Sequence, residues 1–369
     1  MSQDYAAAGV DYDFIDPVKR QAMGLATSTV ANLDSLGIKA VPGTRGESYS
    51  AVELPGGAGY IAHVTECLGT KSSVAQAMYR LTGDPRCFTG LGQDTIAMAV
   101  NDILTGGWKP YEIQMYLAAG ASDWFADTAR AEALLDGWRR GCELAGCHWS
   151  GGETPALASI IYPDQIDLAA STVAWVPKGW PLIKGDVQSG DAIVILPSSG
   201  IHANGLSAAR KIAERLPEGY LTQLPNERTF GETLLDPTHI YVNAVITCLQ
   251  NGINIHYAVN VTGHGWRKLM RLQKPFEYVI CHLPKPLPIF DFIQEQTGRD
   301  DRSMLEDFNM GGGFVLFLPQ KEARQAIAII EQYWFPGTIL AGNVYDADQS
   351  QVNIVPKGIR FEASELAIR

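Results

Sequence analysis

The segment from Pro55 to Lys71, with the sequence PGGAGYIAHVTECLGTK, constrains the fold of this chain more than any other stretch. A run of alternating apolar residues reaches a carboxylate, Glu66, and a short turn then leads into a helix-like pattern that begins at Lys71. The segment therefore predicts a strand, a turn and a helix. The strand is preceded by a glycine cluster, which consists of Gly56, Gly57 and Gly59.

The glycines and the lysine of this segment suit a phosphate site. Glycine adopts positive φ and lets backbone N–H groups approach an anion closely, and the start of a helix favours anions. We therefore expect nucleotide phosphates near the glycine cluster and near Gly69-Thr70-Lys71. The chain contains no G-x-x-x-x-G-K-[ST] motif, so this is not a P-loop. The alternatives are a plain turn for the glycines and a solvent-exposed helix-end lysine for Lys71.

Length and composition narrow the function classes. A chain of 369 residues suggests about two domains. The net charge of −11 argues against a general nucleic-acid or anionic-membrane surface. The six cysteines form no C-x-x-C pair, so they predict buried free thiols rather than a zinc site or disulfides. No signal peptide is readable and no apolar run approaches the roughly 18 residues of a membrane span, so we expect a cytoplasmic protein.

The first half of the chain predicts helices over residues 16–36, 71–83, 95–104 and 123–142. Asp94 would start the third of these helices, and Asn101 and Asp102 would lie about two turns further on. Strands are expected over residues 50–54, 60–65, 110–118 and 165–176. Gly151-Gly152-Glu153-Thr154 is interpreted as a second glycine-plus-carboxylate turn.

After a linker at residues 177–181, the second half repeats the alternation of strands and helices. Helices are expected over residues 206–216, 236–252 and 320–333, and strands over 191–196, 314–318 and 338–344. A basic helix with Arg267, Lys268 and Arg271 is expected after Thr262-Gly263-His264-Gly265. Strands followed by long helices in both halves indicate an α/β or α+β architecture, and the glycine-rich turns in each half indicate a shared cleft.

Nine short motifs follow one another across nearly the whole chain. They are YAAAGVDYD at 5–13, GGAGY at 56–60, LGTK at 68–71, GQDTIAMAVND at 92–102, GGET at 151–154, SSGIHANGLSAAR at 198–210, PTHIYV at 237–242, VTGHG at 261–265 and FNMGGGF at 308–314. In this order they resemble the aminoimidazole ribonucleotide (AIR) synthetase family, the phosphoribosylformylglycinamidine cyclo-ligases of purine biosynthesis. Each motif alone is a weak signal, and together they are a strong one.

The resemblance implies a mixed α/β fold with an ATP-binding and dimerisation domain over residues 1–177 and a C-terminal domain over 178–369. Strands of the first domain would pair across a homodimer into a β-barrel, and ATP and substrate would lie in the cleft between the domains. The implied reaction uses ATP to activate the amide oxygen of formylglycinamidine ribonucleotide. An internal nitrogen then attacks, phosphate leaves and the imidazole ring closes. ATP and Mg²⁺ are the implied cofactors, and a need for K⁺ stays open.

The matching motifs also assign roles to residues. The implied catalytic residues are Lys71, His202 and Asp94, and the implied metal ligands are Glu66, Asp94 and Glu153. The implied ATP-binding residues are Gly56, Gly57, Gly59, Gly69, Thr70, Lys71, Asn101 and Glu153. The implied substrate-binding residues are Ser199, Gly200, His202, Asn204, Arg210 and Asn309. These types fit the chemistry, because Mg²⁺ prefers oxygen ligands and histidine moves protons near neutral pH.

Each assignment has a structural alternative. Asp94 could simply cap a helix, and Asn101 could be helix-surface polarity. His202 could be a loop histidine hydrogen-bonded to backbone, Arg210 could cover the surface, and Asn309 could cap a turn.

The chain departs from the family pattern at several positions. Glu66 stands where the family has Asp, and Cys67 and Leu68 replace Gly-Val. His239 stands in place of Arg, His264 interrupts a triple glycine, and the segment after Glu153 loses an acid and a Pro-Gly. The ATP half of the site is therefore better supported than the substrate. The competing hypotheses are a divergent paralogue that activates another amide or acid, and a non-catalytic nucleotide-binding member.

Overall fold

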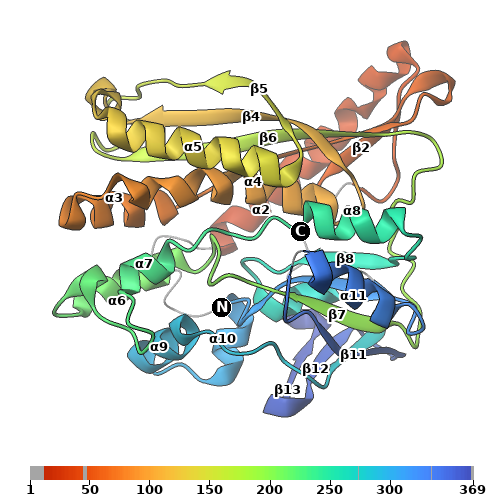
Figure 1. Ribbon diagram of the computed structural model, residues 1–369. Helices are drawn as coiled ribbons and strands as arrows, with labels where there is room; N and C mark the ends of the chain where they lie inside the picture. Colours follow the sequence, from red (N-terminus) through yellow and green to blue (C-terminus); the bar gives the residue numbers. More distant parts are fainter. Residues whose placement is uncertain (1–11, 45–47, 273, 334, 367–369) are drawn as a thin grey trace.

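The structure is a computed structural model that describes residues 12–44, 48–272, 274–333 and 335–366, arranged in two α/β domains (Figure 1). Most of the motif at 5–13 lies outside the described residues. Within these ranges, no helix combines the length and the apolar character that a membrane crossing requires.

The N-terminal domain contains a six-stranded sheet in the order β1-β2-β3-β6-β4-β5. All neighbouring strands are antiparallel except β4 and β5, which are parallel. The strands are β1 Lys39–Ala40, β2 Ser50–Glu53, β3 Tyr60–Cys67, β4 Pro110–Ala119, β5 His148–Glu153 and β6 Ile166–Val176. The four strands predicted in this half are confirmed. β5 was not predicted.

Three helices cover one face of this sheet, the face that looks toward the C-terminal domain in Figure 1. They are α3 Lys71–Thr82, α4 Thr89–Leu104 and α5 Thr128–Ala145. The predicted end of α3 is confirmed, because Gly83 adopts the left-handed φ of 68° that a helix C-cap favours. The predicted start of α5 at Asp123 is wrong. Asp127 caps this helix instead and accepts a hydrogen bond from the backbone N–H of Arg130.

Helix α2, Tyr12–Ser28, precedes the sheet and continues into a 3₁₀ segment, Thr29–Leu36. The predicted start at Asp16-Pro17 is wrong, because the helix begins earlier and contains Pro17. Its apolar side chains point into solvent, with Phe14 78% and Leu25 64% exposed. Isolated helices of this length are marginal in water, so this apolar surface is a candidate contact for another molecule.

The C-terminal domain contains a seven-stranded sheet in the order β13-β12-β9-β11-β7-β10-β8. Its strands are β7 Ala192–Pro197, β8 Tyr257–Asn260, β9 Phe276–Ile280, β10 Gly312–Leu318, β11 Ile339–Asp346, β12 Gln351–Ile354 and β13 Ile359–Glu362. Its helices are α6 Leu206–Arg215, α7 Phe230–Leu234, α8 Val242–Gln250, α9 Pro288–Thr297, α10 Asp301–Asp307 and α11 Ala323–Tyr333. The predicted strands correspond to β7, β10 and β11. The basic helix after Thr262 is a six-residue 3₁₀ segment, Gly265–Met270.

Buried hydrophobic clusters join the two domains. One links Val100 and Ile103 of α4 to Val194 of β7 and Phe314 of β10, and another links Val74 and Met78 of α3 to Phe230 of α7. The opposite face of the N-terminal sheet carries no helix among the described residues, and Tyr111 and Trp175 are each 46% exposed there. The helices of the N-terminal domain therefore form the boundary at which both domains meet.

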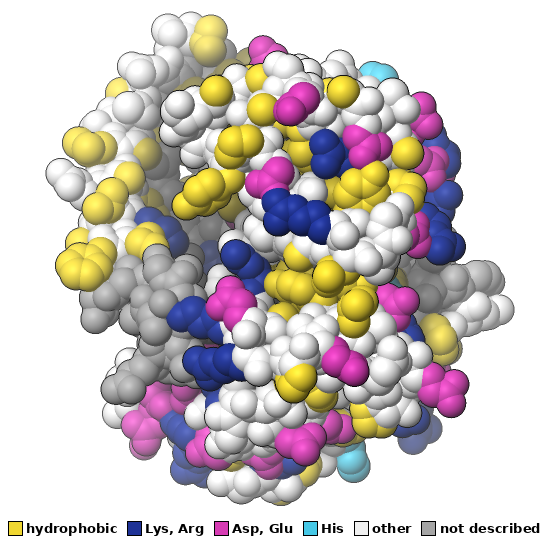
Figure 2. All heavy atoms as spheres, turned by 90° about the vertical axis from the view of Figure 1, so that its left-hand side faces the viewer, with side chains coloured by type: hydrophobic (Ala, Val, Ile, Leu, Met, Phe, Trp, Pro, Cys, Tyr) yellow, Lys and Arg dark blue, Asp and Glu magenta, His cyan; other side chains and the backbone are white. Residues whose placement is uncertain are grey.

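The surface and the cysteines match the sequence expectations only in part. Acidic and basic side chains lie interspersed on the face shown in Figure 2. All six cysteines are free thiols, but the prediction that they are buried is confirmed only for Cys142 and Cys248. Cys87 and Cys147 are half-buried, and Cys67 and Cys281 are exposed.

Candidate active site at the interface between the domains

Helix α4 supplies the polar side chains that meet the C-terminal domain. Its apolar residues, including Ile96 and Ile103, pack into the shared core at helical spacing. The prediction that Asp94 starts this helix is wrong, because α4 begins at Thr89 and Asp94 lies in its second turn with no exposed surface. Asn101 and Asp102 lie two turns further along, as predicted.

Lys71 and Asp94 form a fully buried ion pair. The Lys71 ammonium donates to Asp94 Oδ1 at 2.8 Å and to the carbonyl oxygen of Asp236 at 2.7 Å. Thr238 adds two further hydrogen bonds to the same Asp94 oxygen, from its N–H at 2.7 Å and its hydroxyl at 2.5 Å. Both ionic side chains have 0% exposed surface. In this conformation Lys71 therefore joins the two domains and presents no surface to a phosphate.

Burial outweighs the favourable contacts in setting the pKa of Asp94. Burial raises the pKa of Asp94, while the Lys71 charge and the Thr238 hydrogen bonds oppose that shift. Asp94 Oδ2 is buried with no hydrogen-bond partner. Gly90 lies one turn earlier on the same face of α4, and a Cβ added to it would be 3.8 Å from this oxygen. An orphaned carboxylate oxygen of this kind is costly unless a donor or a cation reaches it.

The segment at residues 236–241 is held by α4 as an extended strap. Gln93 Nε2 donates to the Thr238 carbonyl at 2.8 Å, and Asn101 Nδ2 donates to the His239 carbonyl at 2.8 Å. Asn101 Oδ1 in turn accepts from the Tyr241 N–H at 3.0 Å. The predicted helix start at Asp236-Pro237 is wrong, because these contacts take up the backbone groups and α8 begins only at Val242. Asn101, predicted to bind ATP, is used here to fix the strap.

His202 lies next to this strap in a strained loop that follows β7. Its backbone has a φ of 61°, in the left-handed region that non-glycine residues seldom adopt. The Ser199 N–H donates to His202 Nε2 at 3.3 Å, so the neutral ring carries its proton on Nδ1. Burial, followed by the neighbouring His239 and Lys71, holds the pKa of His202 well below its usual value. The three predicted catalytic residues, Lys71, Asp94 and His202, therefore come together.

A neutral aromatic cluster surrounds His202. Its ring centroid lies 6.1 Å from that of His239 and 6.4 Å from that of Tyr241. Burial lowers the pKa of His239 to about 4, although Asp236 partly opposes this shift. Gly313 leaves room for the cluster, because a Cβ there would lie 1.9 Å from Tyr241 Oη. Both histidines are therefore uncharged near neutral pH and can act only as neutral donors or acceptors.

Asn309 ties two loops of the predicted substrate site together. Its Oδ1 accepts from the Ser198 hydroxyl at 2.9 Å and from the Gly311 N–H at 2.9 Å, and its Nδ2 donates to the Gly200 carbonyl at 2.9 Å. With a side chain used this way, Asn309 shapes the loop that holds His202 rather than reaching outward.

The other predicted substrate residues lie around the same loop. The Ser199 hydroxyl donates to the Pro237 carbonyl at 2.6 Å, and Asn204 Nδ2 is buried with no hydrogen-bond partner. Arg210 is half-buried on α6 and hydrogen-bonds the Tyr220 side chain, away from the strap. Asn204 is therefore the predicted substrate residue with an unused donor.

A second polar cluster lies at the end of β3. Burial, and then the nearby Asp102 carboxylate, raises the pKa of Glu66 to about 7. Asp102 Oδ1 accepts from Asn260 Nδ2 at 2.7 Å. Lys268, Lys19 and Arg271 act in the opposite direction and lower the pKa of Glu66. Sequence reasoning noted Asp102 only as a neighbour on a helix and gave Lys268 no role, although the basic segment it lies in was visible.

The predicted metal ligands do not converge within one chain. Glu153 lies on β5, three strands away from Glu66, at a separation of about 14 Å for strands spaced ~4.8 Å apart. Among the described residues, no group of three or more His, Cys, Asp or Glu side chains could hold a metal ion. The turn predicted at 151–154 is wrong, because Gly151 and Gly152 continue the edge strand β5 beside β4.

The glycine cluster is likewise far from Lys71. Gly56, Gly57 and Gly59 form the turn before β3, whereas Gly69 and Thr70 follow its other end. Eight strand residues at ~3.3 Å each separate the two turns by about 25 Å. One phosphate group therefore cannot touch both turns of the same chain.

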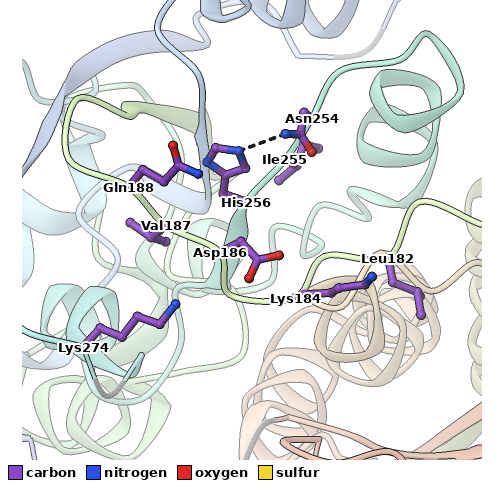
Figure 3. A pocket seen from close by; sticks show the side chains of 9 residues that line it. All are labelled: Leu182, Lys184, Asp186, Val187, Gln188, Asn254, Ile255, His256 and Lys274. Atoms are coloured by element: carbon purple, nitrogen blue, oxygen red, sulfur yellow. Dashed lines mark hydrogen bonds between the residues drawn. The ribbon is translucent and has the colours of Figure 1, made fainter.

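Hollows on the surface of the described residues include two of similar size. One, of about 440 Å³, lies on the uncovered face of the N-terminal sheet and is lined by Glu153, Thr65, Tyr116 and small residues of β5 and β6. The other, also about 440 Å³, is shown in Figure 3 and lies in the C-terminal domain. His256 in its wall has Nδ1 at 2.7 Å from Asp191 Oδ2. None of the predicted site residues lines this second hollow.

Comparison with known proteins assigns the chain to a family. Residues 46–176 match the family "AIR synthase related protein, N-terminal domain", and residues 188–349 match its C-terminal domain. The chain belongs to the AIR synthase related protein family.

The chain is also similar to curated proteins and to solved structures. The phosphoribosylformylglycinamidine cyclo-ligase of Shouchella clausii is 34% identical, over 90% of this chain and 93% of its own length. That of Methanocaldococcus jannaschii is 34% identical, over 96% of both chains. The crystal structure of the hydrogenase maturation protein HypE in complex with ATP has a TM-score of 0.57 at 18% identity, covering 83% of this chain and 85% of HypE. That likeness supports the fold.

Proposed function

We propose that this protein is an ATP-dependent phosphoribosylformylglycinamidine cyclo-ligase. The observation that carries the proposal is 34% identity to curated cyclo-ligases over nine-tenths or more of the chain. The reaction converts formylglycinamidine ribonucleotide and ATP into aminoimidazole ribonucleotide, ADP and phosphate. The γ-phosphoryl group passes to the amide oxygen, the internal amine attacks the activated carbon, and phosphate leaves as the ring closes.

The geometry around the strap supports this chemistry. His202 is a neutral imidazole held near the strap with Nε2 occupied by the Ser199 N–H and burial lowering its pKa, so it suits a hydrogen bond from Nδ1–H to the substrate rather than removal of a proton. Phosphoryl transfer depends on positioning more than on covalent protein chemistry. The Lys71–Asp94–Thr238 network supplies rigidity, because it locks the loops of both domains around His202.

The residues present fit a Mg²⁺ ion that is shared with phosphate groups. Mg²⁺ keeps several waters and usually binds one or two carboxylates together with substrate phosphates. Glu66 and Asp102 form such a pair, and their mutual repulsion contributes to the raised pKa of Glu66. When bound there, the ion would neutralise developing charge on the phosphoryl oxygens. Glu153 would contribute only to a separate site on the sheet face.

We further propose a homodimer that buries the uncovered face of the N-terminal sheet. Tyr111 and Trp175 on that face are each 46% exposed, and exposed apolar patches of this kind mark contacts with other molecules. Trp175→Glu should lower the apparent mass in analytical ultracentrifugation from two chains to one. Leu144→Glu, a change at a residue 44% exposed on α5, is the matched control and should leave the mass unchanged.

The deciding experiment measures ADP release from Mg-ATP with and without formylglycinamidine ribonucleotide, together with the aromatic amine product. ADP that depends on the ribonucleotide and matches the product one to one supports the cyclo-ligase. ATP binding without product points to a paralogue that activates another amide. That outcome would be consistent with the replacement of the family's Arg by the uncharged His239. No ATP binding would refute both enzyme proposals.

A further inference from the structure

The cluster at the end of β3 joins acidic and basic groups of both domains through one residue, Asn260. Its side chain donates to Asp102 Oδ1 at 2.7 Å, and its carbonyl accepts from Lys268 Nζ at 3.4 Å. Lys268 Nζ also donates to the hydroxyl of Thr262. Asn260 is only 4% exposed, so it fixes the carboxylate and the ammonium relative to each other.

The charges of this cluster compensate one another. Glu66 and Asp102 supply two carboxylates from the N-terminal domain, and Asp102 is only 9% exposed. Lys268 is the strongest of the cations that act on Glu66. A buried or half-buried acid pair needs compensation by cations. A divalent ion that binds the two carboxylates would take over this compensation and would repel the ammonium.

Lys71, the lysine expected to contact nucleotide phosphates, is not available for that contact in this structure. Lys71 is fully buried and directs its ammonium at Asp94 and at the Asp236 carbonyl. A phosphoryl group in the site needs a cation close to its oxygens. Lys268 is half-buried, is linked to Asp102 through Asn260, and its charge lowers the pKa of Glu66.

We propose that Lys268 is an exchangeable counter-ion of the active site. Without metal, it compensates Glu66 and Asp102. Once a divalent ion occupies these carboxylates, the Lys268 ammonium turns to a phosphoryl oxygen of the bound ligand. The phosphoryl group belongs either to the nucleotide or to the ribonucleotide substrate, which present the same chemistry. The proposal rests on the proposed function for the identity of these ligands, but the competition between Lys268 and the metal does not.

The test compares wild type with Lys268→Met in the full-length protein. Lys268→Gln is a second, polar variant in case the first perturbs folding. Lys274→Met is the matched control, because its ammonium bonds the Gly185 carbonyl at 2.7 Å in the hollow of Figure 3. Calorimetry measures the binding of three probes: Mn²⁺ alone, Mn²⁺ with the ATP analogue AMPPCP, and formylglycinamidine ribonucleotide. Far-ultraviolet circular dichroism checks the fold of each variant.

Both Lys268 variants should bind Mn²⁺ alone about fivefold more tightly than wild type, because a competing charge is gone. They should bind one phosphate ligand about tenfold more weakly. Weaker Mn²⁺·AMPPCP binding assigns the contact to the nucleotide, and weaker ribonucleotide binding assigns it to the substrate. Unchanged or weaker Mn²⁺ affinity would overturn the exchange, as would undiminished binding of both ligands. A wild type that binds Mn²⁺ but neither ligand would refute the proposed function, while the Mn²⁺ comparison still decides the competition.

Discussion

The buried Lys71–Asp94 pair should dominate the stability of the boundary between the domains. Lys71→Met leaves the Asp94 carboxylate buried with only its Thr238 hydrogen bonds, and both side chains of the pair have 0% exposure. Breaking one partner of a buried pair costs about 3–5 kcal/mol, because an uncompensated charge remains. The free energy of unfolding should therefore fall by about 3–5 kcal/mol for Lys71→Met at pH 8.

The pH dependence of this loss identifies its cause. Burial raises the pKa of Asp94 and Lys71 opposes the shift, so removal of Lys71 should raise that pKa further. When the pKa of a carboxyl is higher in the folded than in the unfolded protein, the free energy of unfolding is highest at low pH and falls as the pH rises through the folded-state pKa. Lys71→Met should therefore be less destabilising at pH 5 than at pH 8.

The assay is urea denaturation followed by tryptophan fluorescence, repeated for Asp94→Asn and for the double variant. A coupling energy of at least about 2 kcal/mol is expected, because each single change leaves the same interaction broken. Lys357→Met is the control, since Lys357 pairs with Asp301 at 2.8 Å on the surface and should cost less than about 1 kcal/mol. Additive single effects, or a loss below about 1 kcal/mol for Lys71→Met, would refute the assignment.

Three further outcomes are expected. The stability of Glu66→Gln minus that of wild type should be larger at pH 8 than at pH 5. The reason is that the pKa of Glu66 is raised to about 7, so ionisation of Glu66 destabilises the wild type above that pH. Denaturation at both pH values checks this. Gly313→Ala should lose several kcal/mol and activity together, because its Cβ would lie 1.9 Å from Tyr241 Oη; an unchanged melting temperature would contradict the packing. With a thiol reagent, the exposed Cys67 and Cys281 should react first. Burial raises the thiol pKa to about 11 for Cys142 and about 12 for Cys147 and Cys248, so these three should react slowly.

Local patterns predicted the elements whose signals lie within a few residues. Strand β3 and helix α3 were found because alternation, helical spacing and a C-cap glycine at Gly83 all occur in the sequence. Strand β5 was missed because its identity depends on pairing with β4, and its two glycines resemble a turn. The strap at 236–241 was missed because side chains of α4, more than 130 residues away in the chain, occupy its backbone groups.

The candidate site was predicted in the same partial way. Motifs indicated that Lys71, Asp94 and His202 belong together, and the structure brings them together. Their burial could not be predicted, because it depends on Thr238 and the Asp236 carbonyl from the other domain. Glu153 and the glycine cluster were grouped with them only by motif order, and the sheet places them at separate positions.

At the strap, the contact that attaches one domain to the other and the side chain that faces the site come from different atoms of the same residue. At residue 239, α4 grips the carbonyl oxygen, an atom that every amino acid carries, while the His239 side chain points to His202 and Tyr241. The side chain at this position can therefore change without loosening the attachment of one domain to the other. Residue 239 is thus a position where a side chain of another shape would leave this attachment between the domains intact, whereas a charge would meet the same burial that lowers the pKa of His239.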